Sequence, residues 1–359
     1  MPRPVRVLIV DDSALIRQIL AAGLGADPEI EVVGTAGDPY QARDRLQELE
    51  VDVLTLDVEM PRMDGVAFLK RLMPQYPLPV VMVSALTERG KSITLDALEA
   101  GAVDFVTKPK ADVARGLQAM MQELRGKVKA AAGAKVTAPR HTAAAPVQAP
   151  LSAGALAEST DKVVAIGAST GGTEAIRTVI TRFPLGMPGV VIVQHMPAGF
   201  TRMFAERMDS LCAIEVKEAE DGDRIRPGRA LIAPGGQHLQ VKRSGGIYVA
   251  RVAPGELTCG HCPSVEVLMQ SVAKAVGSNA IGVMLTGMGR DGATGMKAMR
   301  EAGARCFAQD EASSVVFGMP KEAHACGGAE QLVPLEQMAD TVLAALRQSG
   351  TAIYRRKDS

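Results

Sequence analysis

The sequence contains no tryptophan, and aromatic residues make up only 3% of its 359 residues. Aliphatic side chains and 18 methionines must therefore fill the protein interior. The chain also has no excess of either charge, because 40 basic and 40 acidic side chains give a formal net charge of +0. Such a chain produces no overall field that attracts nucleic acid, so we expect no nucleic acid partner.

Long apolar runs and a cysteine framework are also missing. No run approaches the roughly 20 apolar residues of a membrane helix, and no apolar leader precedes the first expected strand at Val5. The five cysteines follow no repeated spacing, which is typical of a reducing compartment. We therefore expect a cytoplasmic, monomeric protein that does not insert into the membrane, with a length that suits roughly two domains.

Residues 1–122 form the first expected domain. Short apolar runs alternate there with helical patterns, and these runs lie at residues 5–10, 30–33, 53–56, 79–83 and 102–106. The alternation predicts βαβ units around a parallel sheet, that is, a doubly wound (βα)5 α/β fold. Ligands of such sheets bind beyond the carboxyl ends of the strands.

Polar residues occupy these strand ends: Asp11, Asp12, Asp57, Ser84 and Lys108. Three carboxylates that converge on one edge would repel one another without a cation, and their hard oxygen ligands suit Mg²⁺. A lysine and a hydroxyl nearby would hold the oxygens of a phosphoryl group. Each aspartate alone could instead cap a helix, and this alternative is strongest for Asp12. The gathering of all five residues favours the Mg²⁺ site.

These residues resemble those of response-regulator receiver domains. The segments in register with that family are Asp11-Asp12, Leu56–Gly65, Ser84-Ala85 and Lys108-Pro109. The resemblance implies that Asp57 accepts a phosphoryl group from a partner histidine kinase. It further implies Mg²⁺ ligation by Asp11, Asp12, Asp57 and the Glu59 carbonyl, phosphoryl binding by Ser84 and Lys108, and an aromatic switch at Phe105. A receiver domain alone does not define the output.

Residues 123–160 are expected to form a linker. Alanine, proline, threonine, lysine and glycine dominate this segment, and large apolar residues almost vanish from it. Little apolar burial could offset the entropy cost of ordering such a chain, which predicts a flexible tether.

Residues 161–349 form the second expected domain, again with alternating strands and helices. The apolar run at 163–166 leads into Gly167-Ala-Ser-Thr-Gly171, and a helical pattern follows. A strand, a tight glycine-rich turn and a helix are the context in which Gly-x-Ser-x-Gly exposes a serine nucleophile, here Ser169. The same loop could instead cradle a phosphate at the helix N-terminus.

Two further runs, at residues 189–193 and 280–285, lead into His195 and Asp291. We therefore expect Ser169, His195 and Asp291 at one edge of a mostly parallel sheet, as the nucleophile, base and carboxylate of a catalytic triad. Residues 229–252, with glycine pairs, predict a hairpin-rich antiparallel annex. His238, His261 and His324 follow no apolar strand, so we expect structural roles for them.

Cys259-Gly-His-Cys262 offers a competing motif. Its Cys-x-x-Cys spacing suits a dithiol oxidoreductase, and Pro263 could begin the helix whose N-terminus would lower a thiol pKa. No thioredoxin-like βαβ pattern precedes the motif, and a zinc site would need two more ligands. A dithiol or metal role is therefore the weaker interpretation, and we expect no cofactor in this domain.

The sequences Gly-Ala-Ser-Thr-Gly-Gly, Gln-His-Met-Pro and Leu-Thr-Gly-Met-Gly-Arg-Asp-Gly resemble those of chemotaxis protein-glutamate methylesterases. The resemblance implies that Ser169, His195 and Asp291 form the triad and that the Met288 amide donates to the oxyanion. It implies phosphorylation-activated hydrolysis of glutamate γ-methyl esters on chemoreceptors, giving adaptation, and deamidation of receptor glutamines in many members.

Two other outputs suit the sequence less well. A DNA-binding output would need a helix-turn-helix with a basic face, which the alternating strands do not suit. A nucleotide-binding module would need Gly-x-Gly-x-x-Gly, a pattern that Gly167-Ala-Ser interrupts.

Overall fold

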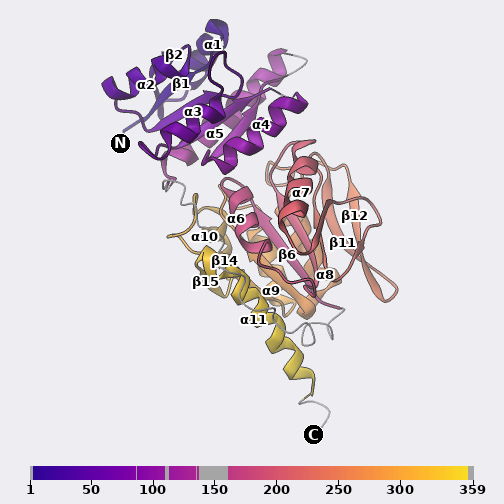
Figure 1. Cartoon of the computed structure of the whole chain (residues 1–359). Coiled ribbons are helices and arrows are strands. Elements are labelled where there is room, and N and C mark those ends of the chain that lie inside the picture. Colours follow the sequence, from indigo (N-terminus) through magenta and orange to yellow (C-terminus); the bar gives the residue numbers. More distant parts are fainter. Residues whose placement is uncertain (1–2, 86, 110–112, 135, 137–160, 355–359) are drawn as a thin grey trace. The chain divides into compact units, whose positions relative to one another are not determined.

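The computed structural model describes residues 3–85, 87–109, 113–134, 136 and 161–354. The chain divides into two compact units, residues 1–142 and 143–359 (Figure 1). Most of the predicted linker, residues 137–160, lies outside the described residues. Both units are α/β, as the sequence predicts. In the described residues, no helix combines the length and apolarity that crossing a membrane requires.

The first unit is a parallel five-stranded sheet in the order β2-β1-β3-β4-β5. Its strands are β1 (Val5–Val10), β2 (Ile30–Ala36), β3 (Val53–Asp57), β4 (Val80–Ser84) and β5 (Asp104–Thr107). Its helices are α1 (Ala14–Gly25), α2 (Pro39–Glu48), α3 (Gly65–Leu72), α4 (Glu88–Glu99) and α5 (Val113–Ala132). The predicted (βα)5 order is confirmed.

Burial explains why these strands read as continuous apolar runs. Every residue of β3 and β4 is buried, because both faces of a parallel sheet are covered. Helices α1 to α4 begin at side-chain caps, such as Asp64, whose carboxylate accepts a 2.7 Å hydrogen bond from the amide of Ala67.

Helix α5 corrects the predicted start of the linker. It continues to Ala132, ten residues into the segment 123–160 that composition assigned to a tether. The reason is a buried stripe at helical spacing, formed by Leu124, Val128 and Ala131, each 0% exposed. Alanine and lysine are also good helix formers, so a composition poor in large apolar residues did not exclude a helix here.

The second unit contains a seven-stranded parallel sheet in the order β15-β14-β13-β6-β7-β10-β8. The strands are β6 (Val163–Ala168), β7 (Gly189–Gln194), β8 (Glu215–Glu218), β10 (Arg229–Ile232), β13 (Ala280–Met284), β14 (Arg305–Gln309) and β15 (Gln331–Val333). The helices are α6 (Gly172–Ile180), α7 (Phe200–Leu211), α8 (Val265–Ala275), the 3-10 helix η2 (Gly277–Asn279), α9 (Ala293–Glu301), α10 (Met319–Ala325) and α11 (Leu335–Tyr354).

The antiparallel annex is smaller than predicted. It consists of β9 (Arg224–Ile225), β11 (His238–Ser244) and β12 (Ile247–Ala253), in the order β11-β12-β9. Residues 229–232, which the sequence assigned to this hairpin-rich section, belong instead to the parallel sheet as β10. Ala230, Leu231 and Ile232 are all 0% exposed, which suits a strand covered on both faces.

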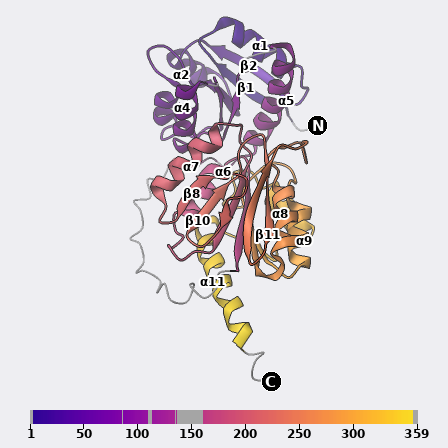
Figure 2. The same cartoon turned by 90° about the vertical axis from the view of Figure 1, so that its right-hand side faces the viewer.

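The strand order reverses between β6 and β13. Helix α6 connects β6 to β7 in one direction, and α9 connects β13 to β14 in the other. Since parallel crossovers are right-handed, the two helices must cover opposite faces of the sheet. Figure 2 shows α8 and α9 on one side and α6 and α11 on the other. A reversal of this kind opens a crevice at the carboxyl ends of the two strands.

Candidate active site and acidic cluster

Ser169 lies on the tight turn between β6 and α6. Its amide donates to the Thr286 carbonyl over 3.0 Å, and its carbonyl accepts from the Gly172 amide over 2.7 Å. Gly171 has a φ of 74° and opens the helix in a left-handed conformation that favours glycine. The turn therefore fixes both backbone groups of Ser169 and leaves the side chain at the crevice between β6 and β13.

His195 connects the serine to a carboxylate. Its Nδ1 lies 3.1 Å from Ser169 Oγ, and its Nε2 lies 2.7 Å from Asp291 Oδ2. The side chains of His195 and Asp291 are only 7% and 1% exposed. A neutral ring with its proton on Nε2 donates to the carboxylate and leaves Nδ1 to accept the serine proton. The three residues predicted as a triad are thus connected by two hydrogen bonds, Ser169 to His195 and His195 to Asp291.

The N-terminus of α8 holds the Asp291 carboxylate. Oδ2 accepts from the Val265 amide over 2.7 Å, while Oδ1 accepts from the Glu266 amide over 3.0 Å and from Ser264 Oγ over 2.8 Å. Burial acts to raise the pKa of Asp291, but the hydrogen bonds from His195, Ser264 and the Glu266 amide outweigh it and lower this pKa. The carboxylate is therefore stabilised in its charged form.

Two polar residues beside the triad were not predicted from the sequence. Ser264 is 0% exposed and is both the cap of α8 and a donor to Asp291. The side-chain amide of Gln194 donates to the carbonyls of Ser169, at 2.9 Å, and of His195, at 3.2 Å. The Ser-x-x-Glu capping pattern of residues 264–267 is absent, but a serine directly before the apolar helix was a usable signal for Ser264.

A third residue, His261, also lies beside the triad. Its ring stacks on that of His195, with centroids 3.7 Å apart and planes 14° from parallel. The sequence placed it among structural histidines because no strand precedes it. His238 has the expected structural role: its Nδ1 accepts from the Ser264 amide, and its Nε2 donates to the Glu256 carbonyl. His324 is exposed and lies on helix α10.

The Cys-x-x-Cys loop does not have the properties of a reactive dithiol. All five cysteines are free. Burial and then the nearby carboxylates of Asp291 and Glu266 raise the pKa of the Cys259 thiol. Burial also raises the pKa of Cys262. A reactive thiol needs the opposite shift, toward the thiolate.

Met288 lies on the loop between β13 and α9 and is 39% exposed. The neighbouring Gly287 fixes this loop, since its amide donates to the Val316 carbonyl and its own carbonyl accepts from the amides of Gly318 and Met319. A Cβ on Gly287 would lie 2.8 Å from the Cβ of Ser169, so the loop passes directly against the serine. This places the Met288 backbone next to a residue that touches Ser169.

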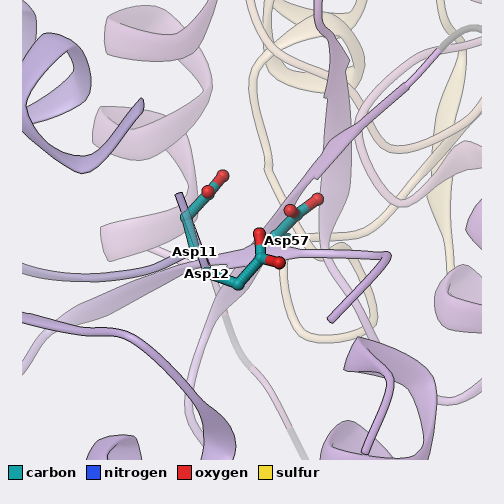
Figure 3. A group of neighbouring side chains, drawn as sticks. All are labelled: Asp11, Asp12 and Asp57. Carbon is teal, nitrogen blue, oxygen red and sulfur yellow. The ribbon is translucent and has the colours of Figure 1, made fainter. Parts of the chain in front are cut away.

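The first unit gathers three carboxylates at its own strand-order reversal, between β1 and β3. One oxygen from each of Asp11, Asp12 and Asp57 lies within 4.8 Å of the others, and Figure 3 shows the three side chains together. Asp11 and Asp57 are buried and Asp12 is exposed. Oxygen donors at this spacing, open on one side, fit a Mg²⁺ ion that keeps several waters.

Lys108 neutralises part of this charge. Its Nζ lies 2.9 Å from Asp11 Oδ2 and 2.8 Å from Asp57 Oδ2. Burial raises the pKa of Asp57 to about 6 against the opposing effect of Lys108, while Asp11 adds to the rise and a hydrogen bond from the Glu59 amide reduces it. Glu59 thus contacts Asp57 through its amide in this structure.

Ser84 is the last residue of β4, and Phe105 lies in β5. Ser84 is 0% exposed, and its Oγ lies 2.6 Å from Thr94 Oγ1, a residue of α4 that was not predicted from the sequence. Phe105 is buried, and Lys127 Nζ lies 5.3 Å from the centroid of its ring. Ser84 therefore contacts α4 in this structure.

A doubly wound domain with an acidic cluster, followed by a parallel-sheet domain with a serine–histidine–aspartate arrangement, defines a response regulator with a hydrolase output. The match to known families agrees: residues 7–120 match the response regulator receiver domain, and residues 164–342 match CheB methylesterase. The chain belongs to the CheB methylesterase family and carries a receiver domain.

Curated relatives span almost the whole chain. A protein-glutamate methylesterase/protein-glutamine glutaminase of Syntrophotalea carbinolica is 67% identical over 353 residues, which cover 97% of this chain and 99% of the relative. A relative of the same name (numbered 2) from Pseudomonas aeruginosa is 52% identical and covers 98% and 100%. The crystal structure of the Thermotoga maritima CheB methylesterase catalytic domain is similar with a TM-score of 0.50 and 36% identity, covering 53% of this chain and 98% of that one.

Proposed function

We propose that the chain is a serine hydrolase that removes γ-methyl esters from chemoreceptor glutamates, and deamidates receptor glutamines, under control of Asp57 phosphorylation. The main support for this proposal is the pair of hydrogen bonds that connects Ser169 Oγ to His195 and His195 to Asp291. A serine hydroxyl is a weak nucleophile until a base takes its proton. The two side-chain substrates are proposed because the relatives are named protein-glutamate methylesterase/protein-glutamine glutaminase.

In the proposed reaction, Ser169 Oγ attacks the γ-carbonyl carbon while His195 Nδ1 takes the hydroxyl proton. The Asp291 carboxylate stabilises the imidazolium that results. The tetrahedral intermediate collapses when His195 returns the proton to the leaving group, which departs as methanol from an ester or as ammonia from an amide. Water then attacks the acyl-serine by the same route and yields glutamate and free Ser169.

The Met288 amide is the proposed donor to the oxyanion of the tetrahedral intermediate. Its loop is fixed by the hydrogen bonds of Gly287 and passes against Ser169, which supports this role. A donor held in place before the reaction stabilises the developing charge without reorganisation. Because the ester and the amide form the same oxyanion, one donor serves both reactions.

In the receiver, we assign Asp57 as the acceptor of a phosphoryl group from a histidine kinase. The carboxylates of Asp11, Asp12 and Asp57 and the carbonyl of Glu59 would hold Mg²⁺, which when bound neutralises charge on the phosphoryl oxygens. Lys108 contacts the Asp57 carboxylate, and this contact supports a role for its ammonium in binding a phosphoryl oxygen.

Ser84 and Phe105 would report phosphorylation. Ser84 Oγ accepts from Thr94 and donates to the carbonyls of Ala85 and Gly90. Donation to a phosphoryl oxygen would replace these donated bonds, and because Gly90 and Thr94 belong to α4, this would couple the phosphoryl group to that helix. Phe105, buried in the neighbouring strand, would repack in response. We propose that the unphosphorylated receiver restrains the hydrolase and that this change releases it, which sets receptor adaptation in the cytoplasm.

The experiment compares demethylation of methylated receptor by the full chain, by the Asp57→Asn chain and by residues 161–354. A phosphodonor with Mg²⁺ should stimulate the full chain only, and Asp57→Asn should remain slow. A tenfold stimulation would require a shift of only about 1.4 kcal/mol between restrained and active states. An isolated hydrolase domain no faster than the unphosphorylated full chain would contradict the restraint, and recruitment to the receptor would then be the role of the receiver.

A further inference from the structure

The ring of His261 covers one face of His195, with centroids 3.7 Å apart and planes 14° from parallel. We propose that His261 is a positioning residue of the hydrolase: its ring fixes the plane of His195 and stabilises the positive charge that His195 acquires. This inference rests on the proposed function, in which His195 is the base. No other aromatic ring stacks on His195 among the described residues.

The two hydrogen bonds of His195 leave the tilt of its ring plane less well defined than the positions of its nitrogens. They attach at Nδ1 and Nε2, so they fix the ring along the line from Ser169 Oγ to Asp291 Oδ2. Tilting of the ring about this line leaves both nitrogens in place, so the two hydrogen bonds resist it only weakly. A flat partner at van der Waals distance on the ring face opposes such tilting, and His261 is placed to supply that contact.

His261 is itself held in place by its backbone. Its amide donates to the Thr258 carbonyl and its carbonyl accepts from the Thr258 amide, both over 3.0 Å. Cys262, the next residue, accepts from the Gly236 amide over 3.1 Å. These bonds are all made by the backbone, so a substitution at 261 can remove the ring without removing them.

The same loop leads directly into the group that holds the carboxylate. Two residues after the cysteine, Ser264 caps α8 and donates to Asp291. One short segment thus presents a ring to the base and a hydroxyl to the acid partner. This shared origin argues that the stacking belongs to the active site and is not a chance surface contact.

The charge formed in the reaction gives the ring a second effect. When His195 takes the serine proton, it becomes an imidazolium between the Asp291 carboxylate and the face of His261. In our proposal the His261 ring is neutral, and the face of a neutral aromatic ring attracts a cation, more strongly where water is excluded. The His195 side chain is only 7% exposed. The stabilisation exists only once the proton has moved, so it should increase kcat and leave substrate binding unchanged.

The test uses the full chain with phosphodonor and Mg²⁺ and measures methanol release from methylated receptor by the wild type, His261→Ala and His261→Phe. We expect His261→Ala to lower kcat on the order of tenfold, with KM within about twofold. His261→Phe keeps a flat ring and should recover most of the lost kcat. The matched control is His324→Ala, at an exposed histidine of helix α10, which should behave as the wild type.

A small fluorophosphonate that labels activated serines provides a second measurement, since it needs no receptor docking. Labelling of His261→Ala should slow in proportion to kcat, with Ser169→Ala as the unlabelled reference, and the thermal unfolding midpoints should match. An unchanged kcat in His261→Ala, a loss confined to KM, or a His261→Phe variant as slow as His261→Ala would each overturn the inference. Full activity in Ser169→Ala would instead contradict the proposed function.

Discussion

The carboxylate of Asp291 accepts a 2.7 Å hydrogen bond from the backbone amide of Val265, at the first residue of helix α8. The amide of Glu266 and the hydroxyl of Ser264 bind the other carboxylate oxygen. A helix N-terminus favours negative charge, so the fold keeps this buried group ionised while its remaining hydrogen bond serves His195. The N-terminus of α8 therefore stabilises the charged form of Asp291 beside His195.

Asp291→Asn should destabilise the hydrolase domain in a pH-dependent manner. The folded-state pKa of Asp291 is below its ordinary value, so its stabilising contribution is complete above the unfolded pKa, about 3.9, and is lost as the pH falls through the lower folded value. At pH 7 we expect a loss of roughly 1–3 kcal/mol on substitution.

The measurement is denaturant unfolding of residues 161–354 at several pH values between 3 and 7. The difference between wild type and Asp291→Asn should shrink toward acid. A difference that stays constant, or grows, down to pH 3 would mean that the charged form of Asp291 is not favoured by folding.

Gly171→Ala should damage both stability and activity. Its φ of 74° strains any side chain, and a Cβ would lie 2.6 Å from the Cβ of Val315. Gly222→Ala is the matched control, because its φ of 87° carries the same kind of strain with open space around the Cβ. The control should lose about 1–2 kcal/mol and keep its activity. Equal effects of the two substitutions on methanol release would show that the Ser169 turn tolerates displacement.

The double variant Cys259→Ser, Cys262→Ser should keep activity within about threefold of the wild type, since neither thiol has the lowered pKa of a reactive group. Methanol release by the hydrolase domain alone is measured without added metal, once with a chelator and once without it. A large loss that added zinc restores would contradict the assignment and favour a metal role for the loop.

Strand ends were the part of both sites that the sequence could predict. Asp11, Asp57, Ser169 and His195 each follow a continuous apolar run, and the ends of parallel strands meet at one sheet edge. Asp11 and Asp57 lie at the ends of β1 and β3, between which the strand order of the first unit reverses. Ser169 and Asp291 follow β6 and β13, between which the order of the second unit reverses, and His195 follows the neighbouring β7. Side-chain chemistry at a strand end is thus visible in local sequence.

Residues that reach a site from a loop or helix that follows no apolar strand were not predicted. His261 and Ser264 lie 66 and 69 residues after His195 in the sequence. No local periodicity reveals such a contact. Thr94 likewise meets Ser84 from a helix. The end of α5 was missed for a different reason: Leu124, Val128 and Ala131 mark a buried helical stripe that a composition window averages away.

The most direct test of the account is the activity of Ser169→Ala in the full chain. The turn is held by backbone hydrogen bonds of Ser169 to Thr286 and Gly172, so removal of Oγ should leave the circular dichroism spectrum and the unfolding midpoint nearly unchanged. With phosphodonor, Mg²⁺ and methylated receptor, methanol release should fall by about 10⁴-fold or more, because the nucleophile is lost. A folded Ser169→Ala protein that releases methanol within about tenfold of the wild-type rate would contradict the serine mechanism.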